Sequence, residues 1–212
     1  MKKALEWGRK NEKNVLLGVA SVSLLLFITV AFTAKAGYFA ALDNATLLSV
    51  RSLESPSLDF IVPLLTMLGD ALFICGITAL LAVWFVYKKW WNKAVLLVAG
   101  VAGSAAMSYI LKAITDRARP ELWTHLVVET SQSFPSGHAT SSMALALCVI
   151  VITRRLSYWR WIVIAAGVYV GSIAFTRLYA GVHYLTDVLA GWLIALMWVA
   201  VVTLIVHMNR QK

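Results

Sequence analysis

The chain has 212 residues, of which 60% are hydrophobic and 14% are charged, and its formal net charge is +9. Soluble domains carry about 25% charged residues, so this composition excludes an ordinary soluble globule and indicates an integral membrane protein. The length suits one domain, and we expect residues 1–212 to form a single membrane-embedded unit.

Six apolar runs are long enough to be transmembrane helices once each is extended by about one turn into its flanks. They are Val15–Ala34, Ala71–Tyr87, Ala94–Leu111, Ala139–Thr153, Trp161–Thr176 and Val188–Val206. The first run follows basic residues, as a signal peptide does. Its apolar core of about 20 residues is longer than a signal peptide allows, so we expect a retained helix and an all-α bundle of six transmembrane helices.

The segment between the first two runs, residues 39–70, contains short apolar pieces broken by Pro56 and Pro63. It predicts a short helix at the membrane interface, followed by the entry into the second transmembrane helix. Asp70 directly precedes that helix and is its expected N-cap, because a carboxylate oxygen can accept a hydrogen bond from an amide of the first turn.

The distribution of Lys and Arg orients the bundle, because positive charge gathers on cytoplasmic segments. With both termini in the cytoplasm, the inner segments hold thirteen basic and two acidic residues, and the outer segments hold six basic and eight acidic residues. This asymmetry explains the positive net charge without a nucleic-acid partner. The short loops and the basic inner face fit a bacterial inner membrane.

Three polar clusters fall on the outer side of this topology, facing the periplasm or the outside. The first runs from Lys112 to Pro120, the second is Pro135–His138, and the third runs from Thr176 to Asp187. Most of the basic residues that set the topology lie in other segments. The agreement therefore predicts that the three clusters form one site.

Three cations in these clusters, Lys112, Arg119 and Arg177, lie near the outer membrane face. Charged groups in an apolar setting are costly unless they meet opposite charges, and the arginine fork and the lysine ammonium both suit phosphate oxygens. Any one of them alone is better explained by snorkelling into the interface. Their convergence with two histidines predicts a phosphate site.

The "PSGH" stretch, Pro135–His138, opens the fourth apolar run. Ser136 suits an N-cap, Gly137 lets the backbone approach a ligand, and the amides of a helix start attract anions. His138 follows directly and can reach the same ligand. The motif alone is weak, because an N-cap serine is common and His138 could be a plain interfacial residue.

His183 and Asp187 are four residues apart, so they share one face if the last helix begins near His183. Asp187 can then accept the Nδ1 hydrogen of His183, which leaves Nε2 free as a nucleophile. A helix-terminal ion pair is the alternative interpretation of this spacing.

Together these motifs resemble the type 2 phosphatidic acid phosphatase family of membrane lipid phosphatases, whose pattern is K-x6-R-P, then PSGH, then S-R-x5-H-x3-D. The matching positions are Lys112, Arg119, Pro120, Pro135–His138, Arg177, His183 and Asp187. The chain departs from the pattern at Thr176, where the family has Ser. Thr keeps the hydroxyl, but its extra methyl group narrows the pocket.

The resemblance implies that His183 attacks phosphorus to form a phosphohistidine, that His138 protonates the leaving alkoxide, and that Asp187 orients His183. The phosphate would be held by Lys112, Arg119, Ser136, Gly137 and Arg177, and Thr176 and Arg117 are further possible contacts. It implies no metal or other cofactor. The implied substrates are lipid phosphates or diphosphates such as phosphatidylglycerophosphate, phosphatidic acid and undecaprenyl diphosphate.

Two other functions remain open at this point. A lipid-to-lipid phosphotransferase would use the same histidine, whereas a transporter would place cations near mid-helix on both sides. Beyond the substrate and membrane lipids, no obligatory protein partner is evident. The loop Glu121–Phe134 is apolar at Trp123, Val127 and neighbouring positions, so it either enters the outer leaflet and guides acyl chains or packs on neighbouring segments.

Overall fold

A computed structural model describes the backbone of residues 2–209 and the side chains of residues 11–207. Some of the basic residues counted on the inner side fall outside the described side chains: Lys2, Lys3, Arg9, Lys10, Arg210 and Lys212. The described chain is helical, with no strand between residues 2 and 209, which confirms the all-α prediction.

The elements follow one another along the chain, and seven of the connections between them are short. They are α1 (Lys2–Lys35), α2 (Ala40–Arg51), α3 (Pro56–Thr66), the 3-10 turn η1 (Met67–Gly69), α4 (Ala71–Tyr87), α5 (Trp91–Thr115), α6 (Gly137–Thr153), α7 (Trp159–Tyr179) and α8 (Leu185–Asn209). The exception is the long loop 116–136 between α5 and α6.

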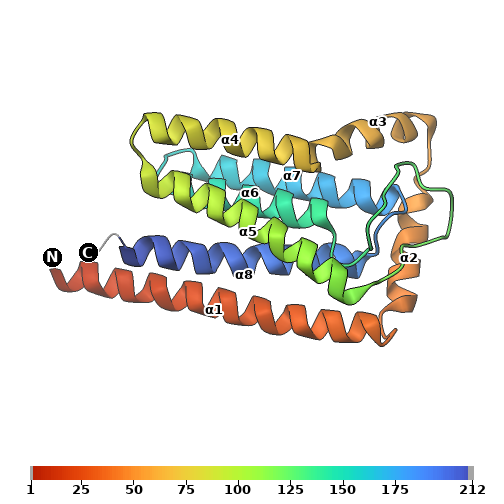
Figure 1. The fold of residues 1–212 in the computed structure, drawn as a ribbon, viewed down its shortest axis with the longest axis horizontal. Helices are drawn as coiled ribbons and strands as arrows, with labels where there is room; N and C mark the ends of the chain where they lie inside the picture. Colours follow the sequence, from red (N-terminus) through yellow and green to blue (C-terminus); the bar gives the residue numbers. More distant parts are fainter. Residues whose placement is uncertain (1, 210–212) are drawn as a thin grey trace.

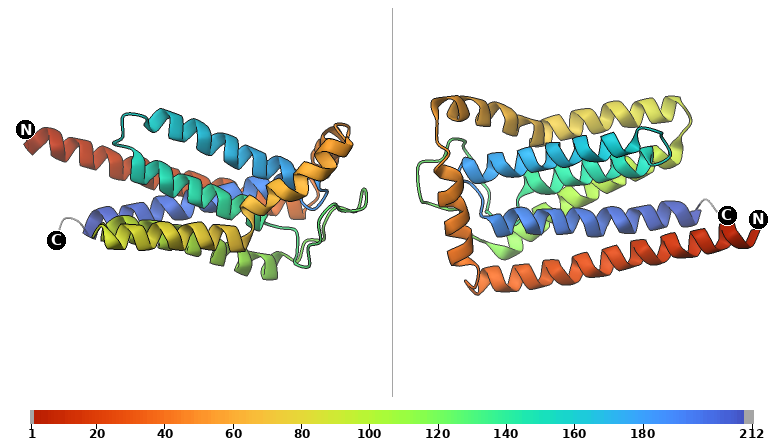
Figure 2. Two further views of the ribbon diagram at one scale, coloured as in Figure 1. Left: turned by 90° about the horizontal axis from the view of Figure 1, so that it is seen from above. Right: turned by 180° about the vertical axis from the view of Figure 1, so that it is seen from behind.

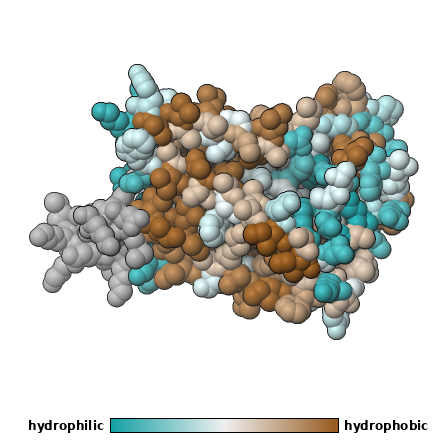
Figure 3. Space-filling model, viewed as in Figure 1, coloured by the Kyte–Doolittle hydropathy of each residue, from teal (hydrophilic) through white to brown (hydrophobic). Residues whose placement is uncertain are grey.

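The long helices run side by side, and α8 is central: it packs against α1, α5 and α6 (Figure 1). α7 packs against α6, and α4 packs against α5. The start of α1 and the end of α8 lie at the same end of the bundle, and α2 crosses the opposite end with the loop 116–136 (Figure 2). Hydrophobic side chains cover the middle of the visible face, and hydrophilic ones gather at the end that carries α2 (Figure 3).

The helices differ in whether they could cross a membrane. Four are long and apolar enough, in α1, α5, α7 and α8, and the pair formed by α3–η1 and α4, bent by 44°, would make a fifth span. α6 has only 17 residues, a rise of about 25 Å against a hydrocarbon core of about 30 Å. Six spans therefore stay a prediction, and α6 is the helix that decides it.

The bend before α4 differs from the sequence prediction in one respect. Asp70 does occupy the N-cap position of α4, but its side chain makes no capping hydrogen bond. The carboxylate instead contacts His138 of α6. A cap is worth only about 1 kcal/mol, and here a partner from another helix replaces it.

Candidate active site

Residues from all three sequence clusters come together at the end of the bundle that carries α2. Lys112 lies in the last turn of α5, His138 in the first turn of α6, and Arg177 near the end of α7. His183 lies in the short connection between α7 and α8, and the loop 116–136 supplies Arg119. The ends of three helices, the connection between α7 and α8, and one loop thus bring the three clusters together, as the topology predicted.

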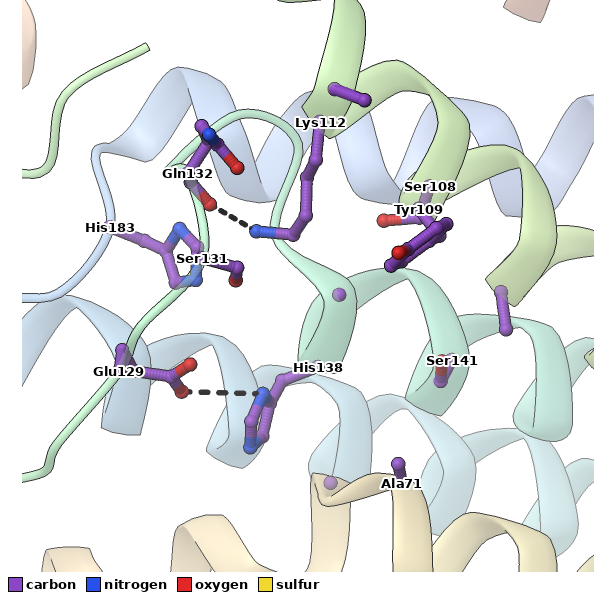
Figure 4. A pocket seen from close by; sticks show the side chains of 14 residues that line it. Ala71, Ser108, Tyr109, Lys112, Glu129, Ser131, Gln132, His138, Ser141 and His183 are labelled. Atoms are coloured by element: carbon purple, nitrogen blue, oxygen red, sulfur yellow. Dashed lines mark hydrogen bonds and ion pairs between the residues drawn. The ribbon is translucent and has the colours of Figure 1, made fainter. Parts of the chain in front are cut away.

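A cavity of about 450 Å³ lies between these elements. Its polar lining comes from Lys112, Glu129, Gln132, His138 and His183, and its apolar and small-residue lining comes from α4, α5 and α6 (Figure 4). Arg119 and Arg177 do not line the cavity themselves. Both are ion-paired with Glu129, which does.

The pair His183 and Asp187 is buried and close, with 3.5 Å between Nδ1 and Oδ2. The same Oδ2 accepts hydrogen bonds from the Ser133 hydroxyl at 2.5 Å and from the Tyr184 amide at 2.8 Å. The carboxylate is therefore held from several sides, and Nδ1 of His183 faces it. Burial, only partly offset by Asp187, lowers the pKa of His183 to about 3, so the imidazole is neutral at physiological pH.

Nε2 of His183 faces the cations. Nη1 of Arg119 lies 3.4 Å from it and donates a hydrogen bond to the carbonyl of Val182 at 2.7 Å. Nε of Arg119 donates to the carbonyl of Ser131 at 2.8 Å. Arg119 therefore ties the loop 116–136 to the connection that carries His183, and it holds a guanidinium beside the free ring nitrogen.

Arg177 is almost completely buried, with 1% of its surface exposed. Nη1 donates to the hydroxyl of Thr66 at 2.8 Å, Nη2 is hydrogen-bonded to Glu129, and the buried Nε has no hydrogen-bond partner in the structure. A buried guanidinium with an unused donor is unusual, because such donors are almost always satisfied. Arg177 thus has capacity for an additional oxygen acceptor.

Glu129 is the anion at the centre of these cations. Its carboxylate pairs with Arg177, lies 3.4 Å from Nη2 of Arg119 and lies 3.9 Å from Nδ1 of His138. Burial alone would raise the pKa of Glu129, but the neighbouring cations, chiefly Arg177, outweigh it, so the pKa of Glu129 is lowered. Glu129 is therefore ionised and offsets part of the positive charge of the two arginines.

Gly137 and Ser136, the predicted phosphate ligands where the loop 116–136 meets α6, have different surroundings. Gly137 lines the cavity close to the Lys112 side chain. Ser136 is fully buried as the N-cap of α6, and its hydroxyl accepts a hydrogen bond from the Ala139 amide at 3.4 Å. Its own amide donates to the carbonyl of Asp187 at 3.0 Å. Ser136 therefore holds α6 against the start of α8 and is not part of the cavity lining.

His138 lines the cavity on the side of α4, and its Nε2 lies 2.5 Å from Oδ1 of Asp70. Gly69 makes this approach possible, because a Cβ there would lie only 3.0 Å from the His138 ring and 2.9 Å from Ile173. The last position of η1 therefore needs glycine for the histidine to lie at this depth.

The two remaining candidates, Thr176 and Arg117, lie outside the cavity lining. The Thr176 hydroxyl donates to the carbonyl of Ile173 in its own helix at 2.7 Å. Arg117 points behind Asp187 and pairs with Asp187 Oδ1 at 2.6 Å and Asp43 Oδ2 at 2.8 Å. Neither side chain reaches the place where a phosphate would contact Lys112 and His183.

Part of the apolar loop packs on protein. Trp123 joins a cluster with Leu47 of α2 and Leu178 of α7. A Cβ on Gly181, which has a positive φ of +74°, would lie 2.6 Å from the Trp123 ring. Val127 packs on another cluster, around Val62 and Tyr179. Val128, however, is 94% exposed and Leu122 is 45% exposed, so these two apolar side chains of the loop are free to meet lipid.

The sequence interpretation missed four polar residues of this region: Asp43, Asp70 as a partner of His138, Glu129 and Ser133. Each carries a carboxylate or a hydroxyl group that lies beside a predicted catalytic or cationic residue. A usable signal existed for Glu129, because three predicted buried cations require nearby anions and Glu129 lies in the loop between two of the clusters.

Comparison with known proteins agrees with the fold. A family model described as the PAP2 superfamily matches residues 93–211. The chain is 29% identical over 184 residues to phosphatidylglycerophosphatase B of Bacillus subtilis (strain 168), which covers 83% of this chain and 89% of that relative. It is 28% identical over 123 residues to undecaprenyl-diphosphatase BcrC of the same organism, which covers 55% of this chain and 60% of that relative.

Two solved structures share the fold. The crystal structure of the transmembrane PAP2 type phosphatidylglycerolphosphate phosphatase from Bacillus subtilis matches with a TM-score of 0.81 at 24% identity, over 91% of this chain and 96% of that one. The structure of Aquifex aeolicus LpxE matches with a TM-score of 0.65 at 22% identity, over 76% of this chain and 94% of that one. Since the family model spans more than half of the sequence and includes all three motifs, the chain belongs to the PAP2 superfamily.

Proposed function

We propose that this protein is a membrane phosphatase that hydrolyses lipid phosphate monoesters or diphosphates of the phosphatidylglycerophosphate, phosphatidic acid or undecaprenyl diphosphate class. One observation carries the proposal: Arg119, Arg177 and His138 surround a single carboxylate, that of Glu129, beside His183. The names of the relatives, phosphatidylglycerophosphatase and undecaprenyl-diphosphatase, support the substrate class.

The Glu129 carboxylate marks where a phosphate would bind. The oxygens of a planar carboxylate and those of a tetrahedral phosphate both suit the arginine fork. A phosphate brings more charge and more acceptors than a carboxylate. Lys112 now donates to the carbonyl of Gln132, and Arg177 has its unused Nε. A phosphate that displaces Glu129 would give all three cations a stronger acceptor.

The nucleophile in this proposal is Nε2 of the neutral His183. Asp187 accepts the Nδ1 hydrogen and stabilises the positive charge that the ring gains as Nε2 bonds phosphorus. The bond from phosphorus to the lipid oxygen breaks, and the three cations stabilise the charge on the phosphoryl oxygens. The intermediate is a phosphohistidine.

The acid in this proposal is His138, which lies across the cavity lining from His183 (Figure 4). Its protonated ring gives a proton to the leaving alkoxide, and the resulting neutral ring then takes a proton from the water that attacks the phosphohistidine. Asp70, whose Oδ1 lies 2.5 Å from Nε2, is placed to orient the ring. Hydrolysis releases inorganic phosphate and regenerates both histidines.

The protein needs no metal for these steps, since three cations already neutralise the phosphate. Among the described residues, no three or more His, Cys, Asp or Glu side chains gather as a metal site would require.

We further propose six spans with both termini in the cytoplasm, α2 at the interface, and a site that faces the periplasm of an inner membrane. The cavity wall along α5, at Ala105, Ser108 and Tyr109, would then lie at the depth of the lipid.

The direct test is phosphate release by the purified full-length protein from a panel of lipid phosphates and diphosphates, with and without EDTA. We expect release from at least one lipid and no effect of chelation. Arg177→Gln removes a buried phosphate ligand, so its activity should fall by two or more orders of magnitude. Transfer of labelled phosphate to a second lipid in place of water would identify a phosphotransferase, and no turnover of any lipid would contradict the proposal.

A further inference from the structure

Asp43 in α2 is a fully buried carboxylate that lies outside all three sequence motifs. Oδ1 accepts a hydrogen bond from the Thr186 amide at 3.0 Å. Oδ2 accepts one from the Thr186 hydroxyl at 2.7 Å and one from Arg117 at 2.8 Å. A buried charge is costly unless it is paired, and all the partners of Asp43 lie next to Asp187.

Arg117 joins Asp43 to Asp187. Nη2 contacts Asp43, while Nη1 donates to Asp187 Oδ1 at 2.6 Å and to the Thr186 hydroxyl at 2.7 Å. The guanidinium lies 4.2 Å from the centre of the Tyr184 ring. These contacts hold the guanidinium on several sides, so its position depends on Asp43 as much as on Asp187.

We propose that Asp43 is a positioning residue for the reaction: through Arg117 and Thr186 it fixes the orientation and the charge balance of Asp187, and through Asp187 it fixes the imidazole of His183. This inference rests on the proposed function. It gives α2 a part in the chemistry although α2 contributes no side chain to the cavity lining.

The first argument is orientation. Arg117 occupies Oδ1 of Asp187, and this leaves Oδ2 to face Nδ1 of His183, the Ser133 hydroxyl and the Tyr184 amide. Without Asp43, Arg117 loses its second carboxylate and can follow Asp187 or move toward solvent. Asp187 then loses the constraint that keeps Oδ2 directed at the imidazole.

The second argument is charge. Two carboxylates and one guanidinium, from Asp43, Asp187 and Arg117, leave one net negative charge behind His183. That charge stabilises the ring as it becomes positive during attack on phosphorus. Neutralising Asp43 leaves the group with no net charge, so the developing charge on His183 loses its support and the chemical step slows.

A purely structural role is the competing explanation, since Asp43 also ties α2 to the start of α8. Asp59 provides the matched control. It lies in the neighbouring short helix α3, accepts a hydrogen bond from the Tyr179 hydroxyl at 2.7 Å and lies 3.7 Å from Arg51. It therefore ties α3 to α7 as Asp43 ties α2 to α8, but none of its contacts reaches Asp187.

The kinetic test compares Asp43→Asn with Asp59→Asn in the full-length protein. We expect Asp43→Asn to lower kcat by about 10-fold or more while KM for a lipid phosphate changes little, and Asp43→Glu to restore part of the loss. Asp59→Asn should keep wild-type kcat. Arg117→Gln and the double variant with Asp43→Asn both keep a net negative charge behind His183 and lose only the orientation, so their kcat should be lowered to about the same extent.

The independent readout is histidine-selective 15N NMR, since the chain has only four histidines. In the wild type we expect His183 to show one fixed tautomer with hydrogen on Nδ1. Asp43→Asn should mix the tautomers, and Asp59→Asn should not. Arg117→Gln, which keeps the bonds between Asp43 and Thr186, gives the same test if Asp43→Asn does not fold.

These outcomes separate the two claims. A wild-type protein that turns over no lipid phosphate contradicts the proposed function, and the tautomer of His183 still tests the role of Asp43. Wild-type kcat and an unchanged His183 spectrum in Asp43→Asn, or losses that simply add in the double variant, would overturn the positioning role.

Discussion

Glu129 reaches the buried guanidinium of Arg177 from the cavity side and forms an ion pair with it. The carboxylate therefore occupies the position that the proposed function assigns to a phosphate. The buried guanidinium of Arg177 would be strongly destabilising without an anion, so the carboxylate stabilises the fold at this point. Under the proposed function, the same carboxylate must give way when substrate binds.

This relationship predicts the effect of Glu129→Gln. Because the amide no longer competes for the arginines, the apparent KM for lipid phosphate should fall by about 3- to 10-fold, and inorganic phosphate should inhibit at lower concentration. Phosphate should also raise the Tm of the variant more than that of the wild type. The exposed Glu121→Gln in the same loop is the matched control. A higher KM in Glu129→Gln would show that the carboxylate helps to bind substrate and does not compete with it.

His138→Ala separates the leaving-group step from the attack. Activity on lipid esters should fall by about 10²- to 10⁴-fold, the usual contribution of a positioned acid. An aryl phosphate, whose leaving group needs no proton, should lose far less. The measurement is kcat/KM on both substrates, with His125→Ala as a control outside the cavity lining. An equal loss on both substrates would argue against the acid role of His138.

The buried His183 predicts a dependence of stability on pH. Its pKa is lowered to about 3 in the folded protein, against about 6.5 in an unfolded chain. As the pH falls below about 6.5, the unfolded chain gains a proton that the folded one does not, so the free energy of unfolding should fall by on the order of 1 kcal/mol per pH unit until about pH 3.

The measurement is the Tm in detergent at about pH 7 and about pH 5. His183→Gln should lose less Tm over this interval than the wild type, whereas His125→Gln should lose as much as the wild type. If the wild type and His183→Gln lose Tm in parallel, His183 is not the buried neutral group that the structure indicates.

The loop 116–136 gives a prediction about lipid contact. Val128 is 94% exposed, while Trp123 packs against α2 and α7. Val128→Asn should raise KM for long-chain lipid phosphates and leave a short soluble phosphate unaffected, because the cations stay in place. Trp123→Ser should instead lower the Tm and reduce activity on both substrates. If Val128→Asn changes neither KM, the loop has no part in lipid binding.

The sequence predicted which charged and polar residues gather in space where those residues lie at helix ends. Lys112, His138 and Arg177 lie in the first or last turns of apolar helices, so the topology alone was enough to bring them together. The PAP2 family and the all-α fold are confirmed. The six spans and the roles of the site residues stay predictions, because they depend on a membrane and on a substrate.

The remaining features depend on contacts that no local pattern encodes. Asp43 meets Thr186 across 143 positions of the chain, and Glu129 lies in a loop without helical periodicity. Asp70 was predicted as a cap because only its neighbours in sequence were visible, whereas His138 from another helix is its partner. Arg117 was a possible substrate ligand for a similar reason, since its partner Asp43 could not be located from the sequence.

The most direct test of the central claim is to find the covalent intermediate. Substrate with a radiolabelled phosphate is mixed with the full-length protein, and the reaction is quenched in denaturant and analysed for acid-labile protein-bound label. We expect label on the wild type at His183, none on His183→Ala, and turnover by that folded variant below about 1% of wild type. Label at another residue, or His183→Ala that still hydrolyses lipid phosphate at a substantial rate, would contradict the assignment of His183 as the nucleophile.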